Sequence, residues 1–346
     1  MKALVLESKG EPFVNKDVQD PVPTDNEAVA KVIACGSGLT IQHVRAGRIK
    51  VDYPRIIGHE ITAVIEEVGK NVTNIKVGDA VTAYFYLTCG YCKWCRNNRE
   101  TLCENFGGYV GREIDGAYAE YIKLPSQNFL KLPEQLDWKE SPAEVAVICD
   151  AIATPYKVIR HASIKDNDTV AIMGAGGGLG IHMIMMAKWA HANIIAVDVA
   201  SDKFQACKNV GADICINPRE HNDNQVFFDY TNGKGVDVVI DFVSSAESLN
   251  LGFSILGRGG RLVTLGGGGG NQNAVIANSM DLLNKEAVVM GSRYATKQEV
   301  IDSLELVARG DVWPLVTDKR DMNEAEQLHS LVEDAKITGR AAILIK

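Results

Sequence analysis

The chain has 346 residues, of which 46% are hydrophobic and 23% charged, and its formal net charge at pH 7 is −8. This is enough for two globular domains of roughly 150 residues, each with its own core. The negative charge argues against nucleic acid or an anionic membrane as a main partner. The first residues predict a short strand and not a signal peptide, and no apolar run is long enough to cross a bilayer, so we expect a cytoplasmic protein.

Short β-branched segments dominate the first 125 residues. Strands are predicted at 28–34, 60–68 and 79–83, separated by turns that contain Gly, Pro and Asp. Short strands at this close spacing indicate a compact β-rich domain.

From about residue 150 strands alternate with helices. This alternation implies βαβ crossovers and a parallel, doubly wound sheet, so the predicted fold class is α/β. The predicted strands are 169–173, 194–199, 214–216, 236–242 and 261–265, the helices between them include 180–190 and 203–210, and a helix at 297–309 leads to a last strand at 341–345.

Four cysteines form the most informative motif, Cys89-x2-Cys92-x2-Cys95-x7-Cys103. Thiolates at this spacing can close a tetrahedral shell around one structural Zn²⁺, which leaves no open position for chemistry. A ferredoxin-type iron–sulfur site needs a shorter last gap and usually a following proline, where this chain has Glu104. Disulfides suit an exported protein, and a redox CxxC does not account for four cysteines. Structural zinc is therefore the favoured interpretation.

A glycine-rich loop joins the strand predicted at 169–173 to the following helix. Its glycines allow a tight turn and a close approach of the backbone to a pyrophosphate at the helix N-terminus. Asp198 ends the next strand, where a carboxylate accepts ribose hydroxyls and repels a 2′-phosphate, so NAD(H) is preferred to NADP(H). An ordinary glycine turn is the alternative, which the βαβ context disfavours. The cofactor contacts predicted in the loop are Gly174, Gly176, Gly177, Gly178, Leu179 and Gly180.

Lys203 lies five positions after Asp198. It suits either a contact to the adenosine ribose or a solvated position on a helix, and the spacing does not separate the two.

The segment Gly58-His59-Glu60 precedes a predicted strand, where a metal ligand can be held. Together with the cysteine motif, the Val77-Gly78-Asp79 turn and the glycine loop, it resembles the zinc-containing medium-chain alcohol dehydrogenases. The resemblance covers essentially the whole chain, with the motifs in the family's order.

The resemblance implies an architecture. It predicts a GroES-like catalytic domain from residues 1–150 and 290–346, with a structural zinc lobe at 89–103, and a nucleotide-binding domain at 151–289. It also implies a small-molecule substrate and a homodimer or homotetramer, in which family members often pair sheets near Gly260–Gly266.

The resemblance also assigns a reaction site. His59 is similar to the histidine ligand of the family's catalytic zinc, Glu60 to the adjacent acidic residue that can enter the zinc shell, and Asp150 to the third ligand. Thr40 and His43 match the hydroxyl and the histidine of the proton relay.

Further resemblances concern the cofactor. Asp198 and Lys203 resemble the family's ribose contacts, and Val243 and Leu265 lie where backbone groups hold the nicotinamide carboxamide. Arg340 resembles a C-terminal arginine near the pyrophosphate.

One departure weakens the predicted catalytic zinc. The family's cysteine ligand precedes the relay hydroxyl by two residues, and that position here is Gly38, which has no side chain. Cys35 lies three residues earlier and needs a rearranged loop to reach the metal. Ile41 replaces the aspartate that commonly supports the histidine ligand.

Three hypotheses follow. The first is an alcohol–carbonyl oxidoreductase that keeps a catalytic Zn²⁺ on His59, Asp150 and Glu60. The second is a zinc-free reductase of a C=C bond conjugated to a carbonyl or thioester, in which hydrogen-bond donors stabilise the enolate. The third, a non-catalytic dinucleotide-binding protein, is disfavoured because Thr40 and His43 are retained.

Overall fold

The computed structural model describes residues 1–220, 224–266 and 279–345. The chain divides into two compact units, Met1–Ala153 with Ala295–Lys346 (unit 1) and Thr154–Tyr294 (unit 2). The sequence predicts the boundaries three to five residues earlier, at 150/151 and 289/290. Segment 290–294 lies in unit 2 because β14 (Val288–Gly291) is the last strand of that unit's sheet.

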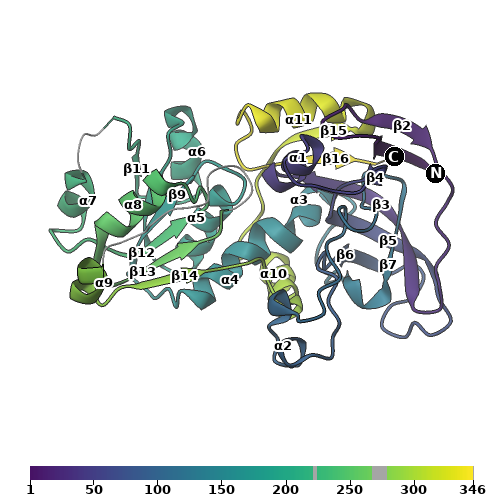
Figure 1. The fold of residues 1–346 in the computed structure, drawn as a ribbon, viewed down its shortest axis with the longest axis horizontal. Helices are drawn as coiled ribbons and strands as arrows, with labels where there is room; N and C mark the ends of the chain where they lie inside the picture. The colour runs from purple at the N-terminus through teal and green to yellow at the C-terminus, as the bar shows by residue number, and fades with distance from the viewer. Residues whose placement is uncertain (221–223, 267–278, 346) are drawn as a thin grey trace. The chain divides into compact units, whose positions relative to one another are not determined.

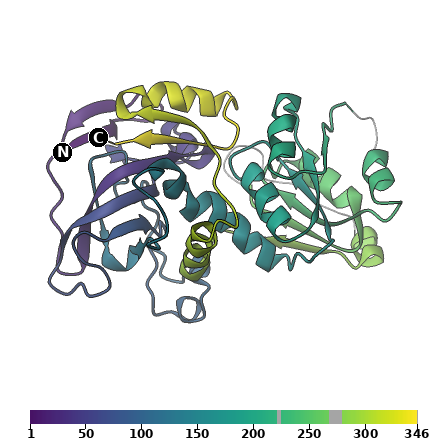
Figure 2. The same cartoon turned by 180° about the vertical axis from the view of Figure 1, so that it is seen from behind.

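Unit 1 is built on two mainly antiparallel sheets. The larger has the order β15-β16-β3-β5-β6-β8, with β7 also paired to β3, and the smaller has the order β2-β1-β4. The C-terminal strand β16 lies between β15 and β3, so the end of the chain returns to the first domain, as Figures 1 and 2 show from opposite sides. Its strands are β1 (Lys2–Leu6), β2 (Val14–Asp17), β3 (Glu27–Ser37), β4 (Arg55–Ile56), β5 (Glu60–Val68), β6 (Ala80–Ala83), β7 (Tyr121–Pro125), β8 (Phe129–Lys131), β15 (Val316–Asp321) and β16 (Arg340–Leu344).

The helices of unit 1 are short, and α3 packs on the central strands β3 and β5 of the larger sheet. They are α1 (Leu39–Arg45), α2 (Lys93–Arg96), α3 (Pro142–Val147), α10 (Lys297–Ala308) and α11 (Ala325–Glu333). A π-helical turn, Ile148–Ile152, follows α3. Such turns are rare and often mark functional sites.

Unit 2 contains a six-stranded parallel sheet with the order β11-β10-β9-β12-β13-β14. The strand order reverses between β9 and β12, and ligands of such sheets bind at this point, beyond the carboxyl ends of the strands. Helices lie on both faces of the sheet (Figures 1 and 2). The strands are β9 (Thr169–Met173), β10 (Asn193–Val197), β11 (Ile214–Ile216), β12 (Val236–Asp241), β13 (Leu256–Thr264) and β14, and the helices are α4 (Ala153–His161), which begins at the boundary, α5 (Gly180–Trp189), α6 (Phe204–Asn209), α7 (Gln225–Tyr230), α8 (Ala246–Ile255) and α9 (Ser279–Lys285).

Apolar strand residues form the core of unit 2. Ala171, Met173, Ile195 and Val197 pack with Phe227, and all five are at most 2% exposed. Because successive side chains of a strand point to opposite faces of the sheet, these alternate residues share one face and pack against the helices. The α/β fold class predicted from the sequence is confirmed.

No helix within residues 1–220, 224–266 and 279–345 is long and apolar enough to cross a membrane. The longest helix of unit 1, α10, has 12 residues.

Candidate active site and metal centres

The four cysteines predicted to bind zinc come together around α2. Their sulfur atoms all lie within 4.8 Å of one another, with Sγ–Sγ distances of 3.9 Å for Cys89–Cys95 and 3.5 Å for both Cys92–Cys95 and Cys89–Cys103. A tetrahedral Zn²⁺ with Zn–S bonds of about 2.3 Å requires adjacent sulfurs about 3.8 Å apart. The donor set therefore fits a structural zinc ion.

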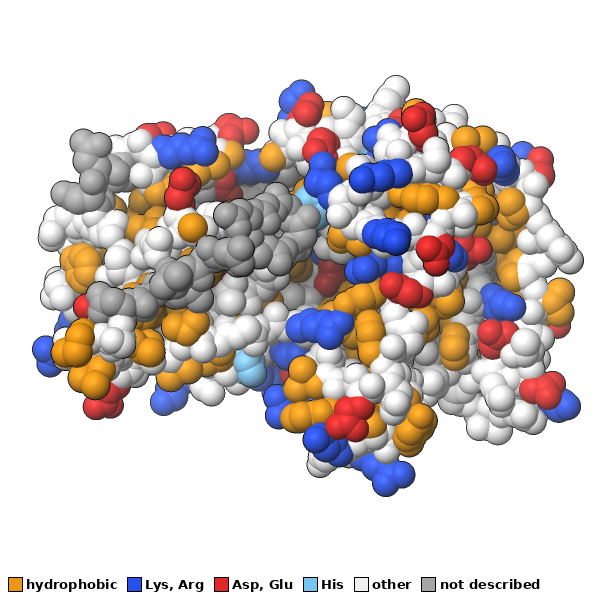
Figure 3. Space-filling view, in the orientation of Figure 1, with side chains coloured by type: hydrophobic (Ala, Val, Ile, Leu, Met, Phe, Trp, Pro, Cys, Tyr) orange, Lys and Arg blue, Asp and Glu red, His pale blue; other side chains and the backbone are white. Residues whose placement is uncertain are grey.

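Cationic side chains surround this lobe. Lys93, Arg96 and Arg99 are exposed, and Lys and Arg side chains gather on the surface around α2 (Figure 3). Lys93 Nζ and Arg99 Cζ lie 5.1 and 4.9 Å from the ring centre of Trp94. Four thiolates and one Zn²⁺ carry a net charge of −2, which these cations offset.

A second cluster combines His59, Glu60 and Asp150, whose ligand atoms also lie within 4.8 Å of one another. Strand pairing brings them together: β5 starts with Glu60 opposite Gly36 of β3. Asp150 is in the π-helical turn after α3. The sequence assigned all three residues to one site, and the structure places them together.

Arg340 lies inside this cluster. Its Nη2 atom is 2.5 Å from Asp150 Oδ2 and 3.2 Å from Glu60 Oε1, and its side chain is 5% exposed. The resemblance implies a position near the pyrophosphate, which stays a prediction; within unit 1 its guanidinium pairs with two carboxylates. The pairing of β16 with β3 places Arg340 here, because the next residue, Ala341, lies opposite Ser37.

Gly38 leaves the space that Arg340 fills. A Cβ atom added at residue 38 would overlap Nη1 of Arg340 and lie 2.9 Å from its Cζ. A cysteine at this position therefore cannot coexist with the observed arginine conformation.

These residues do not fit a catalytic zinc ion. The cysteine ligand is absent, and the guanidinium already occupies the two carboxylates. A dication between them would have to displace a buried cation at hydrogen-bonding distance.

Burial controls the charge states in the cluster. It lowers the pKa of His59 to about 4, so the ring is neutral at pH 7, and Phe85 stacks against it with ring centres 4.2 Å apart. Burial raises the pKa of Glu60, whereas the guanidinium of Arg340 lowers it by stabilising the carboxylate, so the charge of Glu60 depends on this contact. Glu60 Oε2 and Arg340 Nε are buried without a hydrogen-bond partner in the described part of the chain.

The predicted relay residues share one face of α1. Thr40 and His43 are three positions apart, which places their side chains on the same side of the helix. Thr40 is exposed and His43 half-buried.

A hydrogen-bond chain fixes the ring of His43. Arg48 Nε donates to His43 Nδ1 over 2.7 Å. Both terminal nitrogens of Arg48 donate to Glu333, over 2.7 and 2.6 Å, and Gln42 donates to Glu333 over 2.7 Å. A guanidinium has no acceptor, so Nδ1 of His43 must accept and the proton of the neutral ring lies on Nε2. The ring is therefore held in one tautomer.

The same chain of bonds continues into the core. His329 Nδ1 is 2.7 Å from Gln42 Oε1, and its Nε2 is 3.0 Å from the hydroxyl of Tyr118. Sequence reasoning missed Arg48, Glu333 and His329. No local pattern indicates them, because Glu333 lies 285 positions from Arg48.

Three of the predicted cofactor residues, Gly174, Asp198 and Val243, line a cavity of about 450 Å³ in unit 2. Gly174 has φ +73°, the left-handed conformation that its tight turn requires. A Cβ at Gly180 would lie 2.7 Å from Ala175 Cα, so only glycine lets α5 start this close to the loop. The cavity lies at the reversal point of the sheet.

Asp198 organises the loop while facing this cavity. Its Oδ2 accepts the N–H of Gly176 (2.8 Å) and its Oδ1 that of Ala200 (3.0 Å). Lys203 is 6% exposed, so it is not the solvated lysine of the alternative interpretation.

Asp241, at the end of β12, shapes the loop that carries Val243. It is fully buried and accepts N–H bonds from Val243 (2.8 Å) and Ser244 (2.9 Å), while the N–H of Leu265 bonds to its carbonyl (3.0 Å). Sequence reasoning missed this residue, although an aspartate that ends an apolar strand was a visible signal.

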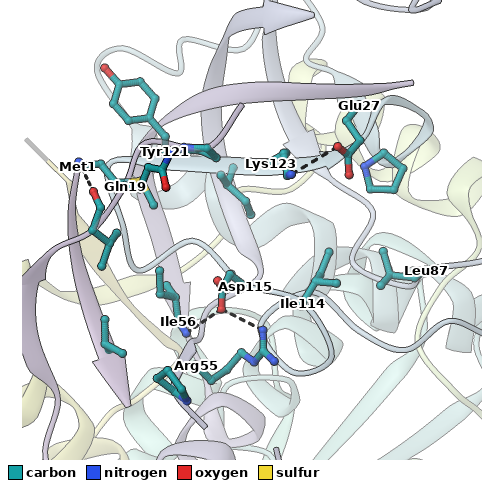
Figure 4. Close-up of a pocket in the computed structure, with 17 residues that line it drawn as sticks. Met1, Gln19, Glu27, Arg55, Ile56, Leu87, Ile114, Asp115, Tyr121 and Lys123 are labelled. Atoms are coloured by element: carbon teal, nitrogen blue, oxygen red, sulfur yellow. Dashed lines mark hydrogen bonds and ion pairs between the residues drawn. The ribbon is translucent and has the colours of Figure 1, made fainter. Parts of the chain in front are cut away.

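A second and larger cavity, of about 630 Å³, lies in unit 1 (Figure 4). Its charged groups are satisfied internally: Asp115 binds Arg55 and the N–H of Ile56, and Lys123 pairs with Glu27. It contains none of the predicted site residues and offers no comparable set of reactive groups.

Comparison with known proteins agrees with this arrangement. Residues 24–134 match the alcohol dehydrogenase GroES-like domain and residues 178–309 the zinc-binding dehydrogenase family. An alcohol dehydrogenase of Geobacillus stearothermophilus is 34% identical, over 100% of this chain and 99% of that protein. The chain belongs to the zinc-containing alcohol dehydrogenase family.

Two further relatives bear on the activity. A crystal structure of an NAD-dependent alcohol dehydrogenase superposes with a TM-score of 0.90 at 26% identity, over 100% of both chains. An acryloyl-coenzyme A reductase of Metallosphaera sedula is 27% identical over 99% of both chains. The prediction of an NAD(H)-dependent oxidoreductase of the medium-chain type is confirmed.

Replacing one ligand of the four-cysteine lobe should remove its metal. Cys92→Ser is expected to lower bound zinc by one ion per chain and to expose the amides of residues 89–103 to hydrogen exchange, because the ion holds the loop together. Cys215→Ser, outside the lobe, should leave the zinc content unchanged. Equal zinc contents for the two variants, measured by mass spectrometry, would contradict the assignment.

The charges around His43 should move its pKa in opposite directions. Burial and the positive charge of Arg48 lower this pKa, whereas Glu333 raises it. Arg48→Met is therefore expected to raise the pKa of His43, and Glu333→Gln to lower it. NMR titration of labelled histidines, with His43→Asn to assign the signal, measures both shifts. A shift of the same sign in both variants would refute the electrostatic account.

Proposed function

We propose that this protein transfers hydride between NAD(H) and a small alcohol or its carbonyl partner. The cavity at the reversal point of the parallel sheet supports the proposal, because Gly174, Asp198 and Val243, which the sequence assigned to NAD(H), line it. The nicotinamide supplies or accepts the hydride, and the residues of unit 1 bind the substrate and move the proton.

The glycine loop and the strand ends bind the cofactor. Free N–H groups at the start of α5 favour the pyrophosphate, and the Asp198 carboxylate accepts the ribose hydroxyls and repels a 2′-phosphate. Lys203 lies beside the ribose. Backbone groups of Val243 and Leu265, held by Asp241, bond the carboxamide. The loop contacts are Gly174, Gly176, Gly177, Gly178, Leu179 and Gly180.

Thr40 and His43 carry the proton. The hydroxyl of Thr40 bonds the reacting oxygen, and His43 on the same helix face passes the proton toward solvent. Arg48 holds Nδ1 of His43, so the group that faces the relay is Nε2–H. A proton passes through the ring when Arg48 releases Nδ1, because one nitrogen then takes up a proton as the other gives one up. A positioned acid–base group of this kind contributes about 10² to 10⁴ in rate.

Reduction of a C=C bond conjugated to a carbonyl or thioester is the second candidate. Arg340 occupies the space that Gly38 leaves open, and this favours the second candidate. Reduction of a conjugated C=C bond needs hydrogen-bond donors for an enolate and no metal to acidify an alcohol. The acryloyl-coenzyme A reductase named above is a relative with such an activity.

Self-association and a cytoplasmic location complete the proposal. Among the described strands β14 pairs only with β13, and near it Met280, Leu283 and Val288 are 60, 67 and 47% exposed. An open strand edge with apolar neighbours suits a two-fold interface between two copies. None of the eight cysteines forms a disulfide, as a reducing compartment allows, and cell fractionation tests the location.

A substrate screen with purified full-length protein tests the activity. We expect NADH oxidation with ketones or aldehydes for the first candidate, or with enones or enoyl thioesters for the second, and rates with NADPH at least about tenfold lower. Thr40→Ala should lower kcat about 10²-fold or more without changing the Kd of NADH. No turnover of either class, with NADH binding intact, would refute both candidates.

A charge on β14 should weaken self-association. Val288→Asp is expected to shift the sedimentation profile toward monomer, because it places a carboxylate in an apolar interface. Val22→Asp, at an exposed valine of unit 1, is the control: Val22 is 64% exposed and Val288 47%. An unchanged profile for Val288→Asp would place the interface elsewhere.

A further inference from the structure

The arginine in the predicted zinc site has a consequence for the reaction centre, which rests on the proposed function. A single nitrogen, Nη2 of Arg340, contacts both Asp150 and Glu60. These two carboxylates and His59 are the side chains that would have to bind the metal. The guanidinium thus takes the position of a cation shared between the two carboxylates.

The other terminal nitrogen explains the missing cysteine. Nη1 of Arg340 fills the position that the Cβ of any side chain at residue 38 would occupy. Gly38 is buried and forms the N-cap of α1, so it cannot move away into solvent. Glycine at 38 and the inward arginine are therefore sterically coupled.

Charge and ligand number both oppose a second metal. Zn²⁺ at a catalytic site takes three protein ligands and an open position. Here one ligand is absent, and the two carboxylates already balance a fixed positive charge. Adding a dication would bring two cations into contact in a buried site.

We propose that Arg340 replaces the catalytic zinc of this family as the resident cation of the centre. It positions Glu60 and Asp150, and the protein binds one zinc ion per chain, at the four cysteines. The substrate is then activated by hydrogen bonds and the proton relay alone.

Zinc content of the full-length protein tests this. After equilibration with zinc and dialysis, the wild type and Gly38→Cys should each contain one zinc per chain, Cys92→Ser none, and Gly38→Cys/Arg340→Met two. Leu39→Cys/Arg340→Met, with a cysteine at the adjacent exposed position, should contain one. Two zinc ions in the wild type, or in Gly38→Cys alone, would overturn the proposal, as would equal contents in the two double variants.

Thermal melting supplies a second readout for the steric coupling. Gly38→Ala should lower the Tm of the wild type by a few degrees, because its Cβ collides with the guanidinium, and should lower it much less in the Arg340→Met background. Equal losses in the two backgrounds would overturn the coupling. The wild-type zinc count decides the proposal where Arg340→Met does not fold.

These measurements need no substrate. An inactive protein with one zinc per chain refutes the proposed function and leaves the role of Arg340 standing. An active protein with two zinc ions per chain refutes the role of Arg340 and leaves the proposed function standing.

Discussion

The buried ion-pair cluster of Arg340 with Glu60 and Asp150 is the constraint on which the rest of unit 1 depends. Its members come from the last strand β16, the start of β5 and the π-helical turn, and Gly38 at the start of α1 makes the room. Removing one partner of such a cluster leaves an uncompensated buried charge, at a cost of about 3–5 kcal/mol. The cluster therefore ties the C-terminal strand to residues of the first half of the chain.

The fold was largely predictable because its signals are local. Strands 60–68, 169–173 and 214–216 appear at the predicted residues, since each is an apolar, β-branched run between turn-forming residues. Strand β13 was predicted to start at 261 and starts at Leu256. Of the added segment only Leu256 pairs, with Val236 of β12, and regular pairing with β12 and β14 begins at Arg261, the predicted start.

The two predicted metal sites differ because only one of them has a local signal in the sequence. The four cysteines lie within fifteen positions, so their spacing already contains the geometry. The partners of Arg340 lie 190 and 280 positions away, and no sequence pattern reports such a contact. From the sequence, Gly38 indicates only a lost ligand. The structure shows that the space left by this ligand is filled by a different cation.

Changing the cation while keeping the proposed relay bears on the choice of substrate. Arg48 and Glu333 orient the ring of His43 independently of the ion-pair cluster, so the proposed relay with Thr40 does not depend on that cluster. Oxidation of an alcohol first requires loss of its hydroxyl proton, which a bound metal promotes by lowering the hydroxyl pKa. Reduction starts instead from an electrophile that hydrogen bonds can polarise and ends by accepting a proton. Both directions of one reaction share a transition state, so a guanidinium in place of the metal selects the substrate and not the direction. It suits acceptors that hydrogen bonds alone can polarise, whether carbonyls or conjugated double bonds.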